Sequence, residues 1–147
     1  MPYTYEYPRP MVTVDSIVLW KDYSGWKLLL IKRKNEPYQN LWAFPGGFVE
    51  MDESLEAAAA RELEEETGMK NIPLEQFKTF GDTKRDPRGR NISVVYYGIT
   101  SKSNVEIRAN DDAVEVQWFP ITELPDLAFD HEMIFGMFKS RILANYS

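Results

Sequence analysis

Residues 47–69 read GFVEMDESLEAAAARELEEETGM. The four consecutive alanines, residues 57–60, are the strongest helix formers and predict a helix over residues 54–67. Glu62, Glu65 and Glu66 fall on one face of this helix, because residues three and four apart are neighbours. Like charges at that spacing destabilise a helix by roughly a few tenths of a kcal/mol per pair. A cation is therefore expected on this face, since one arginine, Arg61, faces seven glutamates in the stretch.

A solvated acidic face is the ordinary explanation of such a charge run. Here the run has fixed ends. It begins after the tight turn Phe44-Pro45-Gly46-Gly47, which directly follows an apolar segment, and it stops at Gly68, a residue type that commonly ends helices. A hard cation needs oxygen ligands that converge in a fixed geometry. The two fixed ends therefore favour a metal site over a solvated face.

The remaining sequence alternates β-type segments with helical ones and contains no linker or repeat. A hairpin turn is expected at residues 22–25, and a packed helix at residues 129–143. Tyr3, Tyr5 and Tyr7 alternate with polar residues, which suits an edge strand and a homodimer contact. The other expected strands cover residues 11–20, 26–31, 41–44, 77–81, 91–99 and 114–119.

The spacing of the acidic stretch resembles the signature of the Nudix hydrolases at every constrained position. The matching residues are Gly47, Glu53, Arg61, Glu62, Leu63, Glu65, Glu66, Gly68 and Met69. The resemblance implies an α/β fold, a Nudix-type α/β/α sandwich with a mixed β-sheet, formed by one domain over residues 1–147. It also implies hydrolysis of a nucleoside diphosphate linked to another group, in which water attacks phosphorus.

The resemblance also implies a set of metal ligands. Glu62, Glu65 and Glu66 are the expected carboxylate ligands of Mg²⁺, for which Mn²⁺ is an expected substitute, and the family also uses the backbone carbonyl at Gly47. Two ions sharing these ligands would clamp the attacking and leaving oxygens. Arg61 and Glu53 are expected to form a structural pair that orients the turn. The alternative is an incidental surface pair worth about 0–1 kcal/mol.

The general base has two candidate sources. In the family it is a glutamate of the motif, here Glu62, Glu65 or Glu66, or an acid on a later loop. Downstream, the acidic cluster Asp111, Asp112 and Glu115 precedes an expected strand. Glu115 or Asp112 is the candidate there, and the alternative is a polar loop. His131, the single histidine, is expected to be a packed or exposed helix residue rather than a base.

Residues 81–90, GDTKRDPRGR, form a basic loop in an acidic chain. Arg85, Arg88 and Arg90 are expected to bind phosphate or ribose oxygens through their guanidinium groups, and the alternative is a solvated hairpin tip. The stretch RDPRGR, with YPRP at residues 7–10 and LAFDH at residues 127–131, resembles the ADP-ribose pyrophosphatase branch. The expected reaction is therefore Mg²⁺-dependent hydrolysis of ADP-ribose to AMP and ribose 5-phosphate.

Two rival functions stay open at this point. One is hydrolysis of another nucleotide, such as a nucleoside triphosphate or a nucleotide sugar. The other is a non-catalytic ADP-ribose-sensing module, as in repressors of this branch that carry a winged helix after the Nudix domain. The intact acidic motif, and a sequence that ends at Ser147, give the expectation of turnover rather than sensing.

Composition limits the classes of binding partner and the cellular locations expected for this chain. The net charge of −6 argues against general nucleic-acid binding and favours a small-molecule nucleotide, for which bound cations and local arginines must reverse the field. The chain has no cysteine, which excludes disulfides and thiolate metal sites. No apolar run reaches the length of a membrane span, and residues 1–10 lack the apolar core of a signal peptide. A cytoplasmic location is the expectation.

Overall fold

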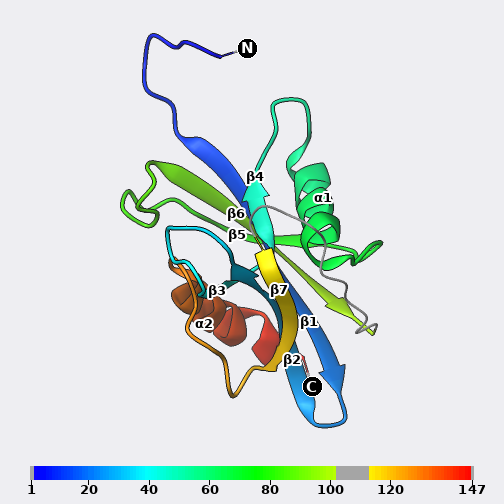
Figure 1. Ribbon diagram of the computed structural model, residues 1–147. Coiled ribbons are helices and arrows are strands. Elements are labelled where there is room, and N and C mark those ends of the chain that lie inside the picture. The colour runs from blue at the N-terminus through cyan, green and yellow to red at the C-terminus, as the bar shows by residue number, and fades with distance from the viewer. Residues whose placement is uncertain (1, 102–112, 147) are drawn as a thin grey trace.

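The computed structural model describes residues 2–101 and 113–146 (Figure 1). The chain runs through a long hairpin, two short strands, a helix, a strand pair, a last strand and a second helix. In order these elements are β1 (Met11–Asp22), β2 (Gly25–Arg33), β3 (Trp42–Ala43), β4 (Gly46–Phe48), α1 (Leu55–Thr67), β5 (Glu75–Phe80), β6 (Asn91–Thr100), β7 (Ala113–Pro120), α2 (His131–Arg141) and a short 3₁₀ helix (Leu143–Asn145).

The strands form one mixed sheet. Its main order is β3-β2-β1-β6-β5, while β4 pairs with β1 and β7 pairs with β2. Strands β1 and β6 are parallel over the whole length of β6, from Met11 opposite Asn91 to Trp20 opposite Thr100. The other pairs are antiparallel. This confirms the mixed sheet expected from the sequence.

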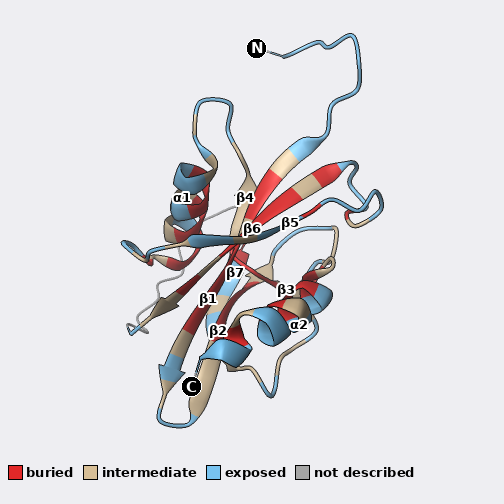
Figure 2. Cartoon of the chain, turned by 180° about the vertical axis from the view of Figure 1, so that it is seen from behind, coloured by how far each residue is buried: buried red, intermediate tan, exposed pale blue. Residues whose placement is uncertain are grey.

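Alternating side chains of β1 serve the two faces of the sheet, as the period of a strand requires. Ile17 and Leu19 pack in the cluster that includes Phe135 of α2. Val14 and Val18 pack instead with residues of α1. The two helices accordingly lie on opposite sides of the strands (Figure 1), with their buried sides turned inward (Figure 2). The expected α/β/α sandwich is therefore confirmed.

Helix α1 has the ends that the sequence predicts. The side chain of Ser54 caps the helix by accepting a hydrogen bond from the Ala57 N–H at 3.1 Å. At the other end Gly68 adopts φ 76°, a left-handed conformation that favours glycine, and its N–H donates to the Glu64 carbonyl at 2.9 Å. The glutamates of the motif are thus held on a helix with fixed limits.

Three expectations about local structure differ from the structure. The segment 2–10 is not a strand, so the edge strand expected from Tyr3, Tyr5 and Tyr7 is wrong; it extends from the body as an arm (Figure 1). The Gly-rich turn contains a short strand, β4, that was not expected. Helix α2 begins at His131 rather than at residue 129, because Phe129 has φ 54° and cannot continue into a right-handed helix.

Among residues 2–101 and 113–146, no helix is long and apolar enough to cross a membrane.

Candidate active site

The Gly-rich turn lies directly against the acidic face of α1. Strand β4 pairs with β1, placing Gly47 opposite Val14. A Cβ at Gly47 would lie 2.7 Å from the carboxylate of Glu62, so a larger residue here would have to displace the end of that side chain. The N–H of Gly46 donates to Glu66 Oε1 at 2.7 Å. The structure therefore brings together Gly47, Glu62 and Glu66, three of the predicted metal ligands.

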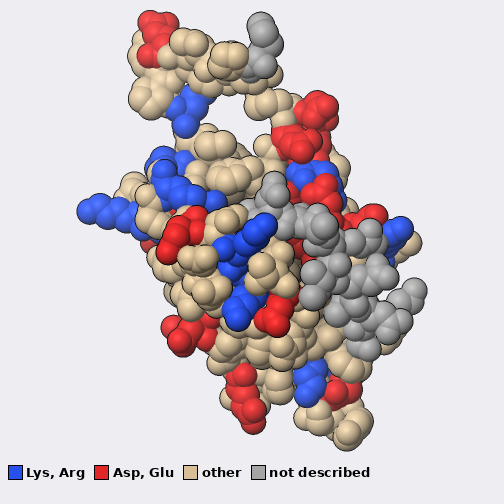
Figure 3. All heavy atoms as spheres, in the orientation of Figure 1, with Lys and Arg blue, Asp and Glu red and all other residues tan. Residues whose placement is uncertain are grey.

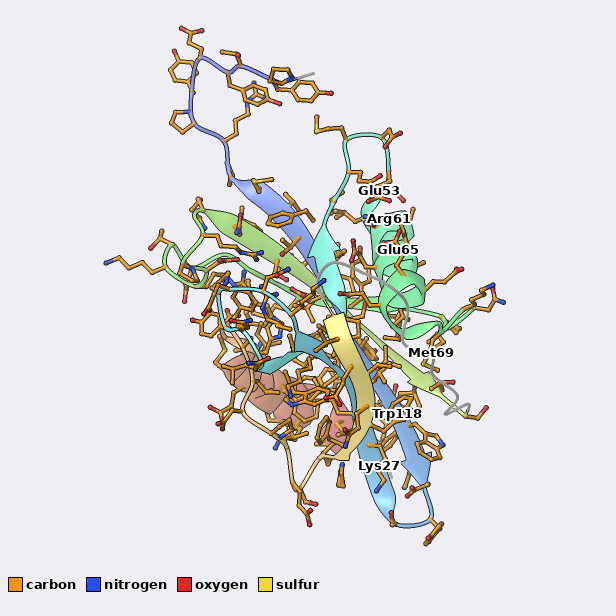
Figure 4. All side chains as sticks on the ribbon, viewed as in Figure 1. Lys27, Glu53, Arg61, Glu65, Met69 and Trp118 are labelled. Atoms are coloured by element: carbon orange, nitrogen blue, oxygen red, sulfur yellow. The ribbon has the colours of Figure 1, made fainter. Side chains whose placement is uncertain are left out.

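Arg61 joins the helix to the segment that precedes it. Its Nε and Nη2 donate to the two carboxylate oxygens of Glu53 at 2.9 and 2.6 Å, and Nη2 also donates to the Phe48 carbonyl at 3.3 Å. These bonds hold the pKa of Glu53 down at about 2. Nη1 of Arg61 contacts Glu62 at 2.8 Å and Glu65 at 3.2 Å. The side chains of Glu53, Arg61 and Glu65 lie along one side of α1 (Figure 4).

The carboxylates of the motif differ in burial. Glu66 is 1% exposed and Glu62 is 8% exposed, whereas about half of the Glu65 side chain faces solvent. A buried carboxylate is costly unless a cation or hydrogen bonds compensate it. Among the described residues no three His, Cys, Asp or Glu side chains converge as metal ligands, and Arg61 contacts both Glu62 and Glu65. The donor set of hard oxygens, with the Glu62 carboxylate brought close to the backbone at Gly47, nevertheless fits Mg²⁺.

A cavity of about 150 Å³ opens beside this turn. It is smaller than the roughly 300–1,000 Å³ of pockets that enclose a complete ligand, so it suits one ring or one group of a larger molecule. The lining comes from β1, β2, β3, β4 and the turn between β3 and β4, from α1, from the β5–β6 loop, and from the start of α2 with Phe129 before it. The polar and charged residues among it are Thr13, Asp15, Arg33, Glu66, Arg85, Asp86, Arg88 and His131.

The three arginines of the basic loop have different positions. Arg85 lines the cavity and donates from Nε and Nη2 to both oxygens of Asp130, at 2.9 and 2.7 Å. Its side chain is 5% exposed; burial alone would lower its pKa, but Asp130 keeps the pKa above the ordinary value. Arg88 also lines the cavity. Arg90 does not line it, and donates instead to the Gly81 carbonyl at 2.7 Å.

Arg88 is the most accessible arginine of the lining contributed by this loop. Its side chain is 35% exposed and its Nη2 donates to Asp86 Oδ2 at 2.7 Å. Burial raises the pKa of Asp86, but bonds from Arg88 and Asn91 outweigh it and bring the pKa down to about 2. The Arg88 guanidinium lies 5.0 Å from the ring centre of Phe48 and 5.1 Å from that of Phe129. It is therefore placed between aromatic rings at the cavity, as a cation–π contact favours.

Charge is distributed unevenly over this side of the molecule (Figure 3). Acidic side chains gather over the start of α1 and the segment before it, while basic side chains gather over the loop between β5 and β6. The arginine loop and the acidic motif thus approach the cavity from different sides. An anionic ligand is expected to enter where the basic side chains lie.

Sequence reasoning missed a buried pair in the cavity. Asp15 of β1 and His131 of α2 both line it, and their Oδ2 and Nε2 atoms are 4.0 Å apart. Burial raises the pKa of Asp15 to about 6 and lowers the pKa of His131 to about 3. The one available signal was the charged Asp15 inside the apolar run VTVDSIVL. His131 is a packed helix residue, one of the two positions expected for it, and its side chain is 2% exposed.

The downstream acids are not brought to the cavity in the described residues. Glu115 lies on β7 with about half of its side chain exposed, and its Oε2 is 3.9 Å from Lys32 Nζ. It is absent from the cavity lining. Asp111 and Asp112, the other members of that cluster, lie outside the described residues.

Comparisons with known proteins identify the family of this chain. The model of the NUDIX domain matches residues 9–136. An ADP-ribose pyrophosphatase of Methanocaldococcus jannaschii is 45% identical over 128 residues, covering 87% of this chain and 72% of that protein. The ADPR responsive transcriptional repressor NtrR of Acinetobacter baylyi is 37% identical over 134 residues, covering 86% of this chain and 52% of the repressor. This chain thus spans about half the length of that relative.

A solved structure of a NUDIX domain has a similar fold. The NUDIX domain of Shewanella oneidensis NrtR complexed with ADP ribose superposes with a TM-score of 0.86 at 32% identity, covering 92% of this chain and 90% of that one. With the family model matching most of its length, the chain belongs to the Nudix family. The resemblance expected from the acidic stretch is confirmed.

Proposed function

We propose that this Nudix pyrophosphohydrolase cleaves ADP-ribose into AMP and ribose 5-phosphate, with Mg²⁺ as cofactor. The observation that carries the proposal is the meeting of two sets of residues at one cavity. Gly47 and the buried Glu66 come from the acidic motif, and Arg85 and Arg88 come from the basic loop. A diphosphate ester needs both a cation held by carboxylates and donors for its remaining oxygens. The M. jannaschii relative named for this activity supports the choice of substrate.

The metal ligands are assigned to Glu62, Glu65, Glu66 and the carbonyl of Gly47. Bound Mg²⁺, or Mn²⁺ in its place, polarises phosphate oxygens and lowers the pKa of bound water. The chain itself contributes the orientation of these ligands: Gly46 N–H fixes Glu66, and Arg61 fixes Glu62. Such supporting contacts keep a metal site in register, and their loss commonly weakens metal affinity roughly 10–100-fold.

The arginines are assigned to the diphosphate and the groups it links. Arg85 is fixed by the bidentate pair with Asp130, so it presents hydrogen-bond donors to the cavity in a fixed orientation. Arg88 is more exposed, and its contact with ligand oxygens is the proposed source of affinity. Arg90, which binds the Gly81 carbonyl, is assigned to holding the loop and contributes to binding only through it.

A glutamate of the motif is the proposed general base. Glu66 lines the cavity where the reacting phosphorus would lie, whereas Glu115 faces Lys32 on β7. Glu62, Glu65, Glu115 and Asp112 remain the rival bases. A base must come within hydrogen-bond reach of the attacking water, directly or through one further water. The cavity position of Glu66 supports it over Glu115.

The test compares Glu66→Gln with Glu64→Gln. Glutamine preserves an acceptor for the Gly46 N–H but removes the charge of Glu66. Glu64 lies on the same helix near Lys70, 3.7 Å away, and serves as the matched control. Glu66→Gln should lower kcat on ADP-ribose about 10²–10⁴-fold with an unchanged fold. Glu64→Gln should stay near wild type. A near-normal rate in Glu66→Gln would remove Glu66 from the site.

Sensing without turnover is the second candidate function, favoured by the similarity to the A. baylyi repressor. One experiment on the purified protein distinguishes hydrolysis from sensing. The protein is incubated with Mg²⁺ and ADP-ribose, ATP or a panel of nucleotide sugars, and the products are resolved by chromatography. AMP and ribose 5-phosphate are expected from ADP-ribose. Tight binding of ADP-ribose without release of AMP would support sensing, and faster cleavage of another nucleotide would replace the proposed substrate.

The proposed partner is a small-molecule nucleotide rather than nucleic acid, and a homodimer is proposed. The net charge of −6 supports the first. The exposed Tyr3 and Tyr7 of the N-terminal arm, 66% and 72% exposed, support the second. Electrophoretic mobility with random duplex DNA tests the first, and sedimentation at micromolar concentration tests the second.

A further inference from the structure

The floor of the cavity contains a donor and an acceptor that the metal site and the arginine loop do not use. His131 is 2% exposed, and the Asp15 side chain is 12% exposed. Both line the cavity, from α2 and from β1. Nε2 of His131 and Oδ2 of Asp15 are 4.0 Å apart, beyond the roughly 2.7–3.2 Å of a direct hydrogen bond. A small polar group that bridges the two atoms would form a hydrogen bond with each of them.

The backbone determines which His131 nitrogen is the donor. The N–H of Phe44 donates to Nδ1 at 3.2 Å, so Nδ1 acts as the acceptor. The proton of the neutral imidazole therefore resides on Nε2, the nitrogen that faces Asp15. The His131 ring also stacks on Phe44, with centroids 4.3 Å apart, which fixes its orientation. Nε2–H is thus a positioned donor.

A hydrogen bond also fixes the position of the Asp15 carboxylate. The hydroxyl of Ser93, a fully buried residue on the neighbouring parallel strand β6, donates to its Oδ2. This carboxylate oxygen has capacity for a further donor. The cavity floor therefore offers one N–H donor, from His131, and one carboxylate acceptor, from Asp15, whose nitrogen and oxygen atoms are 4.0 Å apart.

The ligand group that satisfies both is an aliphatic hydroxyl. A hydroxyl donates one hydrogen bond and accepts others, so its O–H can donate to Asp15 while its oxygen accepts from His131. A phosphate oxygen only accepts, and would be repelled by the Asp15 carboxylate. The floor therefore excludes the diphosphate itself and fits a group attached to it.

The position of the pair favours a sugar over a base. Asp15 pairs with Gly46 in the ladder between β1 and β4, and Gly46 precedes the proposed metal ligand Gly47. In a nucleotide, the base is separated from phosphate by a complete sugar, whereas a sugar is bonded to the phosphate directly. The cavity of about 150 Å³ is also too small for a sugar and base together.

We propose that Asp15 and His131 bind a hydroxyl of the base-free sugar of the substrate, and that Ser93 is a positioning residue for Asp15. The inference rests on the proposed function, because it names the subsite for the sugar that ADP-ribose carries beyond its second phosphate. It makes the pair a determinant of specificity for diphosphates linked to a hydroxylated sugar.

Two substitutions of His131 separate ligand binding from structure. His131→Asn keeps an acceptor near the Nδ1 position, for the Phe44 N–H, and removes the Nε2–H donor. His131→Gln does the reverse. Asp15→Asn keeps the shape of Asp15 and removes its charge. Ribose 5-phosphate and AMP are titrated into the full chain by calorimetry with Mg²⁺ present, since neither contains a diphosphate bond.

His131→Asn and Asp15→Asn should raise the Kd of ribose 5-phosphate about tenfold or more. The Kd of AMP should change less than about twofold, and His131→Gln should bind ribose 5-phosphate better than His131→Asn. Inorganic phosphate should bind the Asn variants as it binds wild type, because it carries no hydroxyl bonded to carbon.

Three outcomes overturn the inference. Loss of AMP binding in place of ribose 5-phosphate binding would assign the pair to the nucleoside. Equal losses for both ligands in His131→Gln and His131→Asn, with a lower unfolding midpoint, would make the role structural. Unchanged ribose 5-phosphate binding in all three variants, with ADP-ribose still hydrolysed, would refute the subsite but preserve the proposed function. Selective loss of ribose 5-phosphate binding, in a protein that does not hydrolyse ADP-ribose, would support the subsite and refute the proposed function.

Discussion

Acidification tests whether His131 is held neutral inside the fold. Burial lowers its pKa from 6.5 to about 3, so the folded chain resists a proton that the unfolded chain accepts. Above pH 6.5 both states are neutral and the effect vanishes. As the pH falls below 6.5 the unfolded state binds the proton first, and stability is lost progressively until the pH reaches about 3.

The magnitude follows from the linkage of protonation to folding. One pH unit between the unfolded and folded pKa corresponds to about 1.4 kcal/mol, so His131 alone costs about 2 kcal/mol at pH 5 relative to pH 8. Asp15, 4.0 Å away, acts in the opposite direction. Burial raises its pKa to about 6, so it takes up a proton in the folded state and offsets part of this loss at pH 5. The charged pair Arg85 and Asp130 lies beside both.

Because the two effects oppose each other, a difference between variants is required. Urea unfolding of wild type and His131→Asn is measured at pH 8 and pH 5, with EDTA in all samples. The free energy of unfolding should fall between the two pH values by about 2 kcal/mol more in wild type than in His131→Asn. Glu132→Gln, an exposed neighbour on α2, should behave as wild type. Equal pH dependence in wild type and His131→Asn would refute the burial of a neutral imidazole.

Three further substitutions test the parts of the site separately. Gly47→Ala should raise the Mg²⁺ concentration for half-maximal activity about tenfold, because its Cβ would lie 2.7 Å from the Glu62 carboxylate; a metal titration measures it. Arg88→Ala should raise KM about tenfold with a smaller change in kcat, and an effect confined to the unfolding midpoint would return the loop to a structural role. Ser54→Ala should cost about 1 kcal/mol in urea unfolding and leave kcat/KM unchanged.

The acidic helix was predictable because its determinants are local. Helix propensity, the cap at Ser54 and the terminator Gly68 all act within a few residues of the elements they define. The spacing of Glu62, Glu65 and Glu66 then follows from the helix period alone. The hairpin turn at residues 22–25 was predictable for the same reason, since Asp22 Oδ1 accepts from the N–H groups of Ser24 and Gly25.

Strand pairing was less predictable because it depends on distant partners. Strand β4 is three residues long, two of them glycine, and exists through its pairing with β1. The alternating Tyr3, Tyr5 and Tyr7 have the correct period for a strand, but within residues 2–101 and 113–146 they pair with no strand. Asp15 and His131 meet only after β1 and α2 pack on each other, and no local pattern records that meeting.

The carboxylate partners of the arginines explain why a site with several arginines would still need a metal ion to bind an anionic ligand. Arg61 is compensated by Glu53 and Glu62, Arg85 by Asp130 and Arg88 by Asp86. In the described part of the chain, each of these guanidinium groups therefore brings little net positive charge. They supply directed donors, and in the proposed site an ion held by Glu62, Glu65 and Glu66 would supply the excess of positive charge that two phosphates demand. Under the proposed function, orientation of the ligand and neutralisation of its charge are thus separate tasks, assigned to the basic loop and to the acidic helix.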